Sequence, residues 1–361
     1  MALKLVVACG GTGGHAFPGL AAAKELASRG HDVTVWMSGR DVESSVLKSW
    51  EGAVFATGAR QLSLKNAFRN LGAIWRCRRE MRRARPDALL AMGSYSSLPP
   101  VLAASGCKVP VVLHEANTVP GRAVDFLSNL AKAVAISFEE TAAHFPARET
   151  VLTGLPVRAD IAGCRRLEEV PEEAFCVFVT GGSQGAHRVN EIASKALVIL
   201  GRELAGSGRS LYVIHQTGAK DAGWVVETYE KAGIPARVNT FEHEMGAAMA
   251  TADAVVARAG ASTCFELALT GTPAFLIPLP SAMRNHQHYN ASAFAAKLAA
   301  AMGSQEELTP GTLSKWLLHA ALRPDCLSSM SENMKAMSVP DAAGRVADLV
   351  ERIAKDSKAN G

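Results

Sequence analysis

A glycine turn near the start of the chain contains the first residues whose types and spacing could do chemistry. Residues 10–15 read Gly-Gly-Thr-Gly-Gly-His and follow a short apolar run that predicts a strand. Glycines let backbone N–H groups approach a ligand closely, and the helix that follows can receive a phosphate at its N-terminus. His15 lies at the mouth of this turn, where an imidazole could remove a proton from an attacking hydroxyl. For a single histidine, local hydrogen bonding is the simpler interpretation.

The same turn also fits a different ligand. The spacing Gly11-x-Gly13-x-x-Ala16 satisfies the fingerprint of dinucleotide-binding proteins. The second expected strand ends at residues 36–38, Trp-Met-Ser, without the acidic residue that would bind a ribose diol. A nicotinamide cofactor is therefore disfavoured, although the turn alone does not decide between a dehydrogenase and a transferase.

A second candidate site lies at residues 258–266, which read Arg-Ala-Gly-Ala-Ser-Thr-Cys-Phe-Glu and follow an expected strand. Ser262 and Thr263 could present hydroxyls and amides to a diphosphate, and Glu266 could accept both hydroxyls of a ribose. The spacing Thr263-x-x-Glu266 is also that of a plain capping box. That alternative explains the two residues but leaves the small residues before Ser262 unused.

Metal-binding patterns are absent from the sequence. It contains no Asp-x-Asp pair, and its seven cysteines form no Cys-x-x-Cys pair and have no histidine at ligand spacing. We therefore expect no metal, no cofactor and no disulfide framework, as suits a reducing cytoplasm. Charge on a departing nucleotide would be met by helix N-termini, glycine-loop amides and hydroxyls.

A strongly basic segment covers residues 66–85, where seven arginines face a single acid, Glu80. The segment predicts a helix whose apolar members include Phe68, Leu71, Ile74, Trp75 and Met81. A basic amphipathic helix can rest on an anionic membrane surface; the alternative is a solvated charged face that covers core residues. Nucleic acid is disfavoured, because no other aromatic residues interleave with the arginines as a stacking platform.

Short apolar runs alternate with helix-length segments, and this rhythm occurs twice. The first series of expected strands covers residues 3–9, 32–36, 87–92, 109–114 and 133–137, and the second covers 175–180, 211–215, 236–240, 253–257 and 273–277. The alternation is typical of parallel, doubly wound sheets. Because both series open with a strand that runs into glycines, we expect two Rossmann-like α/β domains in tandem.

The rhythm lapses over residues 150–171, which predicts a linker with its hinge near 154–158. We expect an N-terminal domain at 1–154 and a C-terminal domain at 158–338. A helix at about 340–357 carries an apolar stripe and is expected to join the N-terminal domain. The sequence shows neither a signal peptide nor an apolar run of about 18 residues, so we expect a chain that is neither secreted nor membrane-spanning.

Five spaced motifs, taken in order, resemble the MurG family of bacterial transferases, which belongs to glycosyltransferase family 28. They are residues 10–15, 93–97 (Gly-Ser-Tyr-Ser-Ser), 114–121 (His-Glu-Ala-Asn-Thr-Val-Pro-Gly), 181–186 (Gly-Gly-Ser-Gln-Gly-Ala) and 285–287 (Asn-His-Gln). The resemblance covers nearly the whole chain. Several motifs in the right order are far more specific than one glycine turn.

The resemblance implies a GT-B fold, in which two Rossmann-like domains face an interdomain cleft. It implies an inverting, metal-independent hexosyltransferase that moves N-acetylglucosamine from UDP-N-acetylglucosamine to the C4 hydroxyl of the muramyl unit of lipid I. Lipid I is undecaprenyl-diphosphate-muramyl-pentapeptide, and the product is lipid II of peptidoglycan synthesis. The implied location is peripheral, on the cytoplasmic face of the bacterial inner membrane, with partners among the cell-wall synthesis and division proteins.

The resemblance also assigns site residues. Substrate contacts are implied for Thr12, Gly13, Gly14, Asn117, Arg158, Ser183, Glu242, Ala261, Ser262, Thr263, Cys264, Phe265, Glu266 and Gln287. Among these, Asn117 and Gln287 match positions on the donor sugar. Glu242 matches a position that contacts uracil through its backbone, so its side-chain identity should matter little. His15 is the first candidate for the catalytic base, and Glu115 is the second.

Three positions depart from the family pattern: Leu155 and Asn285 replace the usual first residues of their motifs, and Val124 stands where the family often has an asparagine. The donor motifs stay recognisable, and Val124 lies on the domain that the resemblance assigns to the acceptor. One alternative is another GT-B enzyme of UDP-sugars, a transferase or an epimerase, which would share the uridine site but lack the segment at 114–117. The other is a non-catalytic, sugar-nucleotide-binding membrane adaptor.

Overall fold

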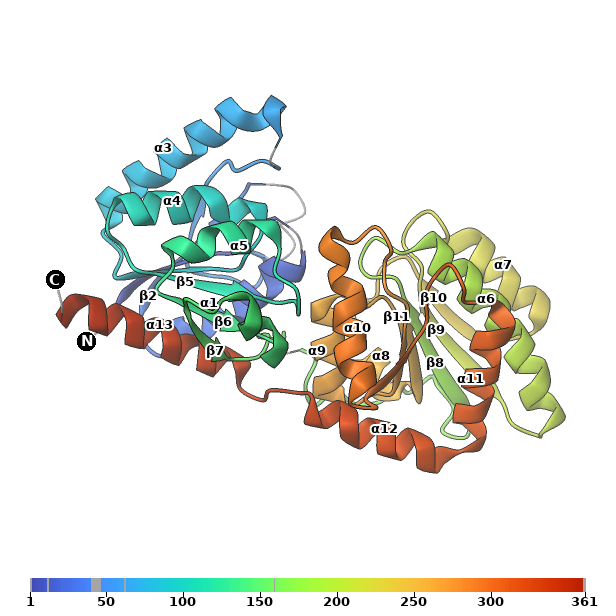
Figure 1. Cartoon of the computed structure of the whole chain (residues 1–361). Coiled ribbons are helices and arrows are strands. Elements are labelled where there is room, and N and C mark those ends of the chain that lie inside the picture. The colour runs from blue at the N-terminus through green and yellow to red at the C-terminus, as the bar shows by residue number, and fades with distance from the viewer. Residues whose placement is uncertain (1, 12, 40–46, 62, 159, 360–361) are drawn as a thin grey trace. The chain divides into compact units, whose positions relative to one another are not determined.

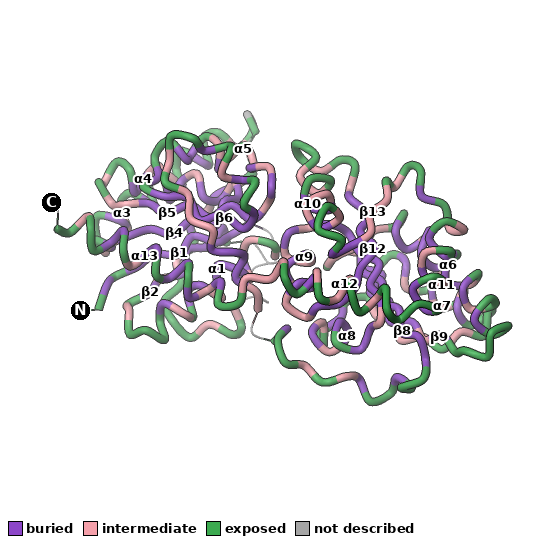
Figure 2. The backbone as a smooth tube through the Cα atoms, turned by 60° about the horizontal axis from the view of Figure 1, so that its bottom comes forward, coloured by how far each residue is buried: buried purple, intermediate pink, exposed green. Residues whose placement is uncertain are grey.

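The computed structural model describes residues 2–11, 13–39, 47–61, 63–158 and 160–359. The chain divides into two compact units. The first contains residues 1–158 and 339–361, and the second contains residues 159–338. Figure 1 shows the elements of each unit, and Figure 2 shows that the strands form the buried centre of each.

The first unit is built on a seven-stranded parallel sheet with the order β3-β2-β1-β4-β5-β6-β7. Its strands are β1 (Lys4–Ala8), β2 (Asp32–Met37), β3 (Ala53–Ala56), β4 (Ala88–Ala91), β5 (Val111–Glu115), β6 (Ala133–Ile136) and β7 (Glu149–Leu152). The strand order reverses between β1 and β4, which pair directly. In such sheets, ligands bind beyond the carboxyl ends of the strands at this switch point.

Helices cover both faces of this sheet. They are α1 (Gly13–Ser28), α3 (Ala67–Ala84), α4 (Leu98–Gly106), α5 (Arg122–Leu127) and α13 (Ala342–Ala359), with short 3₁₀ helices η1 (Leu64–Asn66), η2 (Tyr95–Ser97), η3 (Ser128–Leu130) and η4 (Glu139–His144). Alternate side chains of β1 enter two different cores, since Val7 packs with α1 and α13 whereas Val6 packs with α3 and α4.

The C-terminal helix α13 belongs to the first unit. Its apolar stripe, which includes Val346 and Val350, is fully buried in the core beneath α1. Arg29 adds ion pairs to Asp348 at 2.6 Å and Glu351 at 3.1 Å. The last stretch of the chain therefore completes the hydrophobic face of the first sheet.

The second unit repeats the design with a six-stranded parallel sheet in the order β10-β9-β8-β11-β12-β13. Its strands are β8 (Phe175–Thr180), β9 (Leu211–Gln216), β10 (Ala236–Asn239), β11 (Ala254–Ala257), β12 (Ala274–Leu276) and β13 (Ala300–Met302). Its helices are α6 (His187–Gly206), α7 (Ala222–Ala232), α8 (Met245–Thr251), α9 (Ala261–Thr270), η5 (Met283–Asn285), α10 (His286–Ala296), α11 (Pro310–Leu322) and α12 (Pro324–Ala336). The switch point lies between β8 and β11.

The predicted α/β class with two doubly wound parallel sheets is confirmed. Every strand expected from the sequence is present, with ends that shift by two residues or fewer. Three strands were missed, β3, β7 and β13, and each lies at the edge of its sheet. Within the described ranges, no helix is both long and apolar enough to cross a bilayer.

Candidate active site

The glycine turn after β1 has a conformation that only glycine accepts easily. Gly11 has a φ of 119°, and a Cβ atom there would lie 2.9 Å from the Ser94 hydroxyl. Gly13 and Gly14 form the start of α1. The backbone amides of this first helical turn point toward the carboxyl end of the sheet, as an anion site requires. Thr12 lies outside the described residues.

The turn after β4 holds the turn after β1 across the switch point. The Ser94 hydroxyl donates to the Gly10 carbonyl at 2.7 Å, and the Ser96 hydroxyl donates to the same carbonyl. The Gly93 N–H donates to the Ser97 hydroxyl at 3.1 Å. The motif at 93–97 thus supports the first glycine turn.

His15 is held in one tautomer by the end of β4. Its Nδ1 atom lies 2.7 Å from the Met92 carbonyl oxygen. Because a carbonyl can only accept, Nδ1 is the donor, and in the neutral ring the lone pair is on Nε2. A lone pair at the atom away from the anchoring hydrogen bond is the form that a general base needs.

Glu115, at the end of β5, organises the loop that follows it. Its side chain accepts from the backbone N–H of Asn117 at 2.9 Å, from the Asn117 side-chain amide at 3.0 Å and from the Gly121 N–H at 3.0 Å. Burial raises the pKa of Glu115 to about 6, although these hydrogen bonds act in the opposite direction. Glu115 therefore orients the Asn117 amide and the loop at 116–121.

Next to it, His114 is fully buried and neutral. Its Nε2 atom donates to the Gly154 carbonyl at 3.1 Å, and burial lowers its pKa to about 4. This bond ties β5 to the segment that leads to Arg158. The Arg158 guanidinium lies over the Phe17 ring, 4.8 Å from its centroid, and so stands beside the first turns of α1.

Val124 occupies an apolar position in the core. It is 1% exposed, and a Cβ atom on Gly93 would lie only 2.8 Å from its Cγ2 atom. An asparagine there would place its amide among apolar neighbours, whereas valine fills the space under the turn at 93–97. In this chain the position supports that turn by packing.

In the second unit, the glycine loop after β8 packs directly on the end of β9. A Cβ atom on Gly185 would lie 1.9 Å from the Thr217 carbonyl oxygen, and one on Gly218 would lie 2.3 Å from the Gln184 carbonyl oxygen. Glycine is required at both positions because two backbones touch. Ser183 lies at the exposed tip of the loop.

Gln216, at the end of β9, joins this loop to a second one. Its amide donates to the Gly182 carbonyl at 2.8 Å and to the Thr180 hydroxyl at 3.1 Å. Its carbonyl oxygen accepts the Glu242 N–H at 2.8 Å. Gln216 was not identified from the sequence, although a polar residue at the end of an otherwise apolar strand can indicate a functional or structural role.

Glu242 has a structural role that was not expected. Its carboxylate is buried and accepts from the Arg237 guanidinium at 2.9 Å, from the Asn239 amide at 2.9 Å and from the Glu244 N–H at 2.8 Å. The side chain therefore holds the loop at 239–244 in place. Its identity should matter, contrary to the expectation drawn from backbone contacts alone.

The start of α9 shows that the capping-box interpretation is wrong. The helix begins at Ala261 and its N-cap residue is Gly260, so Thr263 lies inside the first turn and cannot cap it. The small residues at the cap leave the first amides of the helix accessible to an anion. Glu266 lies one turn further along the same helix.

The residues of this segment divide by burial. Ala261, Cys264 and Phe265 are buried, and Phe265 packs edge-on against Phe294 with ring centroids 6.1 Å apart. Ser262, Thr263 and Glu266 are half-buried. The last three can offer side chains to a ligand, whereas Cys264 and Phe265 shape the helix from below.

Helix α10 brings Gln287 to the same end of the sheet. The Gln287 side chain accepts the Leu279 N–H at 2.9 Å, and Asn290 donates to the Ala259 carbonyl at 3.2 Å. These bonds connect α10 to the ends of β12 and β11. Asn290 was not identified from the sequence.

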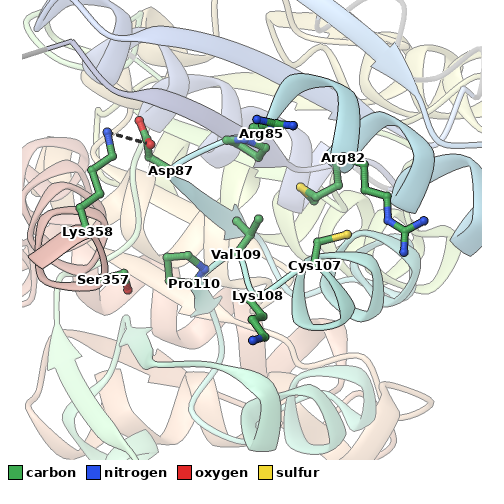
Figure 3. Close-up of a pocket in the computed structure, with 11 residues that line it drawn as sticks. Arg82, Arg85, Asp87, Cys107, Lys108, Val109, Pro110, Ser357 and Lys358 are labelled. Carbon is green, nitrogen blue, oxygen red and sulfur yellow. Dashed lines mark ion pairs between the residues drawn. The ribbon is translucent and has the colours of Figure 1, made fainter. Parts of the chain in front are cut away.

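A pocket of about 620 Å³ lies elsewhere, at the amino ends of β4 and β5 (Figure 3). Its rim includes Arg85 and Lys108, which follow the C-termini of α3 and α4, and an ion pair of 2.8 Å between Asp87 and Lys358. Cations at helix C-termini offset the negative ends of the helix dipoles. This pocket is at the wrong end of the strands to be the candidate active site.

The two Rossmann-like units, each with a parallel sheet and a glycine turn at its switch point, have the fold of the GT-B glycosyltransferases. Residues 5–136 match the glycosyltransferase family 28 N-terminal domain, and residues 176–346 match the glycosyltransferase family 28 C-terminal domain. The chain belongs to glycosyltransferase family 28 and is an enzyme that transfers a sugar.

Similar proteins cover nearly the full length of the chain. The UDP-N-acetylglucosamine--N-acetylmuramyl-(pentapeptide) pyrophosphoryl-undecaprenol N-acetylglucosamine transferase of Geotalea uraniireducens is 36% identical over 97% of this chain and 98% of the relative. The protein with the same name from Rhizobium meliloti is 35% identical over 98% and 96%.

Solved structures share the fold of this chain. The crystal structure of Acinetobacter baumannii MurG has a TM-score of 0.79 at 29% identity and covers 98% of this chain and 100% of that one. A Listeria monocytogenes protein described as a UDP-N-acetylglucosamine 2-epimerase has a TM-score of 0.77 at 11% identity, over 99% and 98%. The second likeness is one of fold alone.

Proposed function

We propose that this chain transfers N-acetylglucosamine from UDP-N-acetylglucosamine to the C4 hydroxyl of the muramyl unit of lipid I, forming lipid II for peptidoglycan synthesis. The observation that carries this proposal is the near full-length similarity to transferases with that printed specificity. The geometry adds that the motif residues of each unit gather at the carboxyl ends of its strands. Residue roles are therefore assigned unit by unit.

The second unit would bind the donor. The start of α9 offers amides and the Ser262 and Thr263 hydroxyls to the diphosphate, and Glu266 is placed to accept the ribose hydroxyls. The loop at 181–185 contributes further amides and Ser183. The loop held by Glu242 would receive the uracil, and Gln287 would contact the sugar.

The first unit would bind the acceptor. The turn at Gly13 and Gly14 supplies helix amides to the lipid diphosphate, since the first residues of α1 have no intrahelical partner for their N–H groups. By the family resemblance, two further residues of this unit would contact the donor: Asn117, whose amide Glu115 orients, and Arg158, which lies beside α1.

The reaction would be an inverting displacement with His15 as the base. The C4 oxygen attacks the anomeric carbon, its proton passes to His15 Nε2, and UDP leaves with the electron pair of the broken bond. The hydrogen bond from Nδ1 to the Met92 carbonyl stabilises the imidazolium that forms. Glu115 is less suitable, because both of its oxygens already accept hydrogen bonds from the loop.

We also propose that α3 contacts an anionic membrane surface at the cytoplasmic face of the inner membrane. Asn70, Ala73 and Cys77 face inward, whereas the outward side chains of Phe68, Leu71 and Trp75 are 87%, 60% and 65% exposed. Residues spaced i, i+3 and i+7 lie on one helix face. An exposed apolar stripe among arginines is the pattern of interfacial helices.

Transfer of labelled N-acetylglucosamine from UDP to a soluble lipid I analogue, with EDTA present, tests this function. We expect a labelled disaccharide product with inverted anomeric configuration and no loss of rate on chelation. Absence of labelled product from a folded protein that binds UDP would refute the proposed acceptor. A rate that needs added divalent metal would refute the metal-independent mechanism.

A further inference from the structure

A buried polar chain in the second unit connects the glycine loop after β8 to the core. Its members are Tyr229 on α7, His215 on β9, Asn190 on α6 and Asp221 before α7. Their exposed fractions are 1%, 0%, 0% and 7%. Buried polar groups are costly unless they are hydrogen-bonded, so a fully paired set in a core has a specific role to explain.

Asn190 fixes the direction of the hydrogen bonds among these four residues. Asn190 Nδ2 lies 2.8 Å from the Thr217 carbonyl and 2.7 Å from an Asp221 carboxylate oxygen, and both of these groups only accept. The other Asn190 atom, Oδ1, therefore faces His215 and must accept from its Nε2 atom at 3.1 Å.

The tautomer of His215 follows from this direction. Nε2 carries the proton, so Nδ1 accepts from the Tyr229 hydroxyl at 2.8 Å. Burial lowers the pKa of His215 to about 3, which keeps the ring neutral at physiological pH. Each ring nitrogen thus has one partner, and Asn190 uses both of its donors and its acceptor.

The hydrogen-bonded set contacts the backbone that supports the glycine loop. Asn190 holds the Thr217 carbonyl, and that oxygen is the atom on which Gly185 packs without room for a Cβ. The Asp221 carboxylate also accepts from His187 at 2.9 Å and from the Trp224 indole at 3.1 Å, at the start of α6 and in α7. A shift of Asn190 would therefore move Thr217 and the loop together.

We propose that His215 is a positioning residue for donor binding, which acts through Asn190 to hold the Thr217 carbonyl and, with it, the glycine loop at 181–185. This inference rests on the proposed function, because it takes that loop as part of the donor site. The loop would bind the donor equally well in the ground state and in the transition state. Replacing His215 should therefore raise KM for the donor with little change in kcat.

Three substitutions separate positioning from mere stability. His215→Leu removes the donor to Asn190. His215→Gln restores it, since the Gln amide can donate to Asn190 and its carbonyl can accept from Tyr229. Val213→Ala is the matched control. Val213 is buried on the same face of β9 and lies in the same core, but its side chain makes no hydrogen bond to the four polar residues.

Donor KM and kcat, together with the Kd of UDP by calorimetry, provide the readout. We expect His215→Leu to raise KM for UDP-N-acetylglucosamine and the Kd of UDP about tenfold or more, with kcat within about threefold of wild type. His215→Gln should stay within about threefold in KM, and Val213→Ala should leave KM unchanged while lowering the unfolding midpoint. Equal KM values for His215→Leu and Val213→Ala, or equal defects in the Leu and Gln variants, would overturn the proposal.

Tyr229→Phe provides a second test should His215→Leu fail to fold. It removes only the hydroxyl that donates to His215 Nδ1, and we expect a rise in KM of about two- to fivefold. An unchanged KM would contradict a positioning role for the hydrogen-bonded set. UDP binding also separates this inference from the proposed function. If wild type binds UDP but transfers no sugar to the lipid I analogue, the function fails, while the UDP affinities of the variants still decide the role of His215.

Discussion

At the scale of single residues, burial sets the charge states around both sites. Adjacent residues on β5 respond in opposite directions, since burial raises the pKa of Glu115 to about 6 and lowers that of His114 to about 4. In both cases burial acts against the charged form, because a low-dielectric interior penalises charge. The His-Glu pair is thus a structural anchor for its loop, which is why we propose His15 and not Glu115 as the catalytic base.

Glu242 provides a residue-scale prediction. Glu242→Ala should leave Arg237 and Asn239 without their buried acceptor, weakening UDP binding about tenfold and lowering the free energy of unfolding by about 3 kcal/mol. Glu244→Ala is the matched control, because Glu244 pairs with the same Arg237 but is 59% exposed, and it should cost less than about 1 kcal/mol. Calorimetry and denaturant unfolding measure both. Equal effects for the two variants would contradict the role given to Glu242.

His215 predicts a specific pH dependence of stability. Its folded pKa is about 3, below the ordinary value of 6.5, so the unfolded state binds the proton more tightly. The stabilisation is complete above pH 6.5 and is lost as pH falls toward 3. Between pH 7 and pH 4, His215→Gln should lose a few kcal/mol less unfolding free energy than wild type. Parallel losses in denaturant titrations at the two pH values would show that this histidine is not held neutral.

Residue roles were only partly accessible from the sequence. His15 and the start of α9 were candidates because their motifs are local, and Glu115 was a candidate through the family resemblance. Gln216, Asn190 and His215 were missed, since their partners come from other elements and each looks like an isolated polar residue in an apolar segment. The side chain of Glu242 was undervalued for the same reason.

At the scale of elements, the apolar pattern of the sequence was sufficient to predict the central strands. Buried strands such as β4 and β8 read as continuous apolar runs, as parallel sheets covered on both faces require. The missed strands β3, β7 and β13 are three or four residues long and lie at sheet edges, and β3 is largely exposed. Their pairing depends on the neighbouring strand more than on their own composition.

Helix α3 carries an element-scale prediction. Replacing Phe68, Leu71 and Trp75 by serine should weaken binding to vesicles that contain anionic lipid by about tenfold or more, because three exposed apolar side chains are lost. Binding by wild type should also fall as salt rises. A variant with Arg188 and Lys195 on α6 replaced by serine is the control and should bind like wild type. Sedimentation with vesicles measures binding by the wild type, the α3 variant and the α6 control. Salt-insensitive binding would indicate that α3 is an ordinary solvent-exposed helix.

At the scale of the whole molecule, the chain leaves its first unit and returns to it. Residues 339–361 complete the core of the first unit, whereas residues 159–338 form a unit with its own sheet and core. Sequence rhythm indicated two tandem folds, because each series of strands opens into glycines. The apolar stripe of α13 is buried in the core of the first unit.

This division gives a prediction for donor binding. A fragment of residues 159–338 contains β8 to β13, the start of α9 and the loop held by Glu242. We expect it to bind UDP with a Kd within about tenfold of that of the full chain, since these elements would supply the uridine and diphosphate contacts. The same fragment with Gly185→Ala is the control and should lose UDP binding, because the Cβ would collide with Thr217. A folded fragment without UDP affinity would place essential donor contacts in the first unit.

The most direct test of the catalytic account is the rate of transfer by His15→Asn. The asparagine amide can replace Nδ1 as the donor to Met92, so the local hydrogen bond is kept while the base is removed. We predict that kcat with the lipid I analogue falls about 10²- to 10⁴-fold while the Kd of UDP is unchanged. Near-normal turnover by this variant would contradict the assignment of His15 as the base.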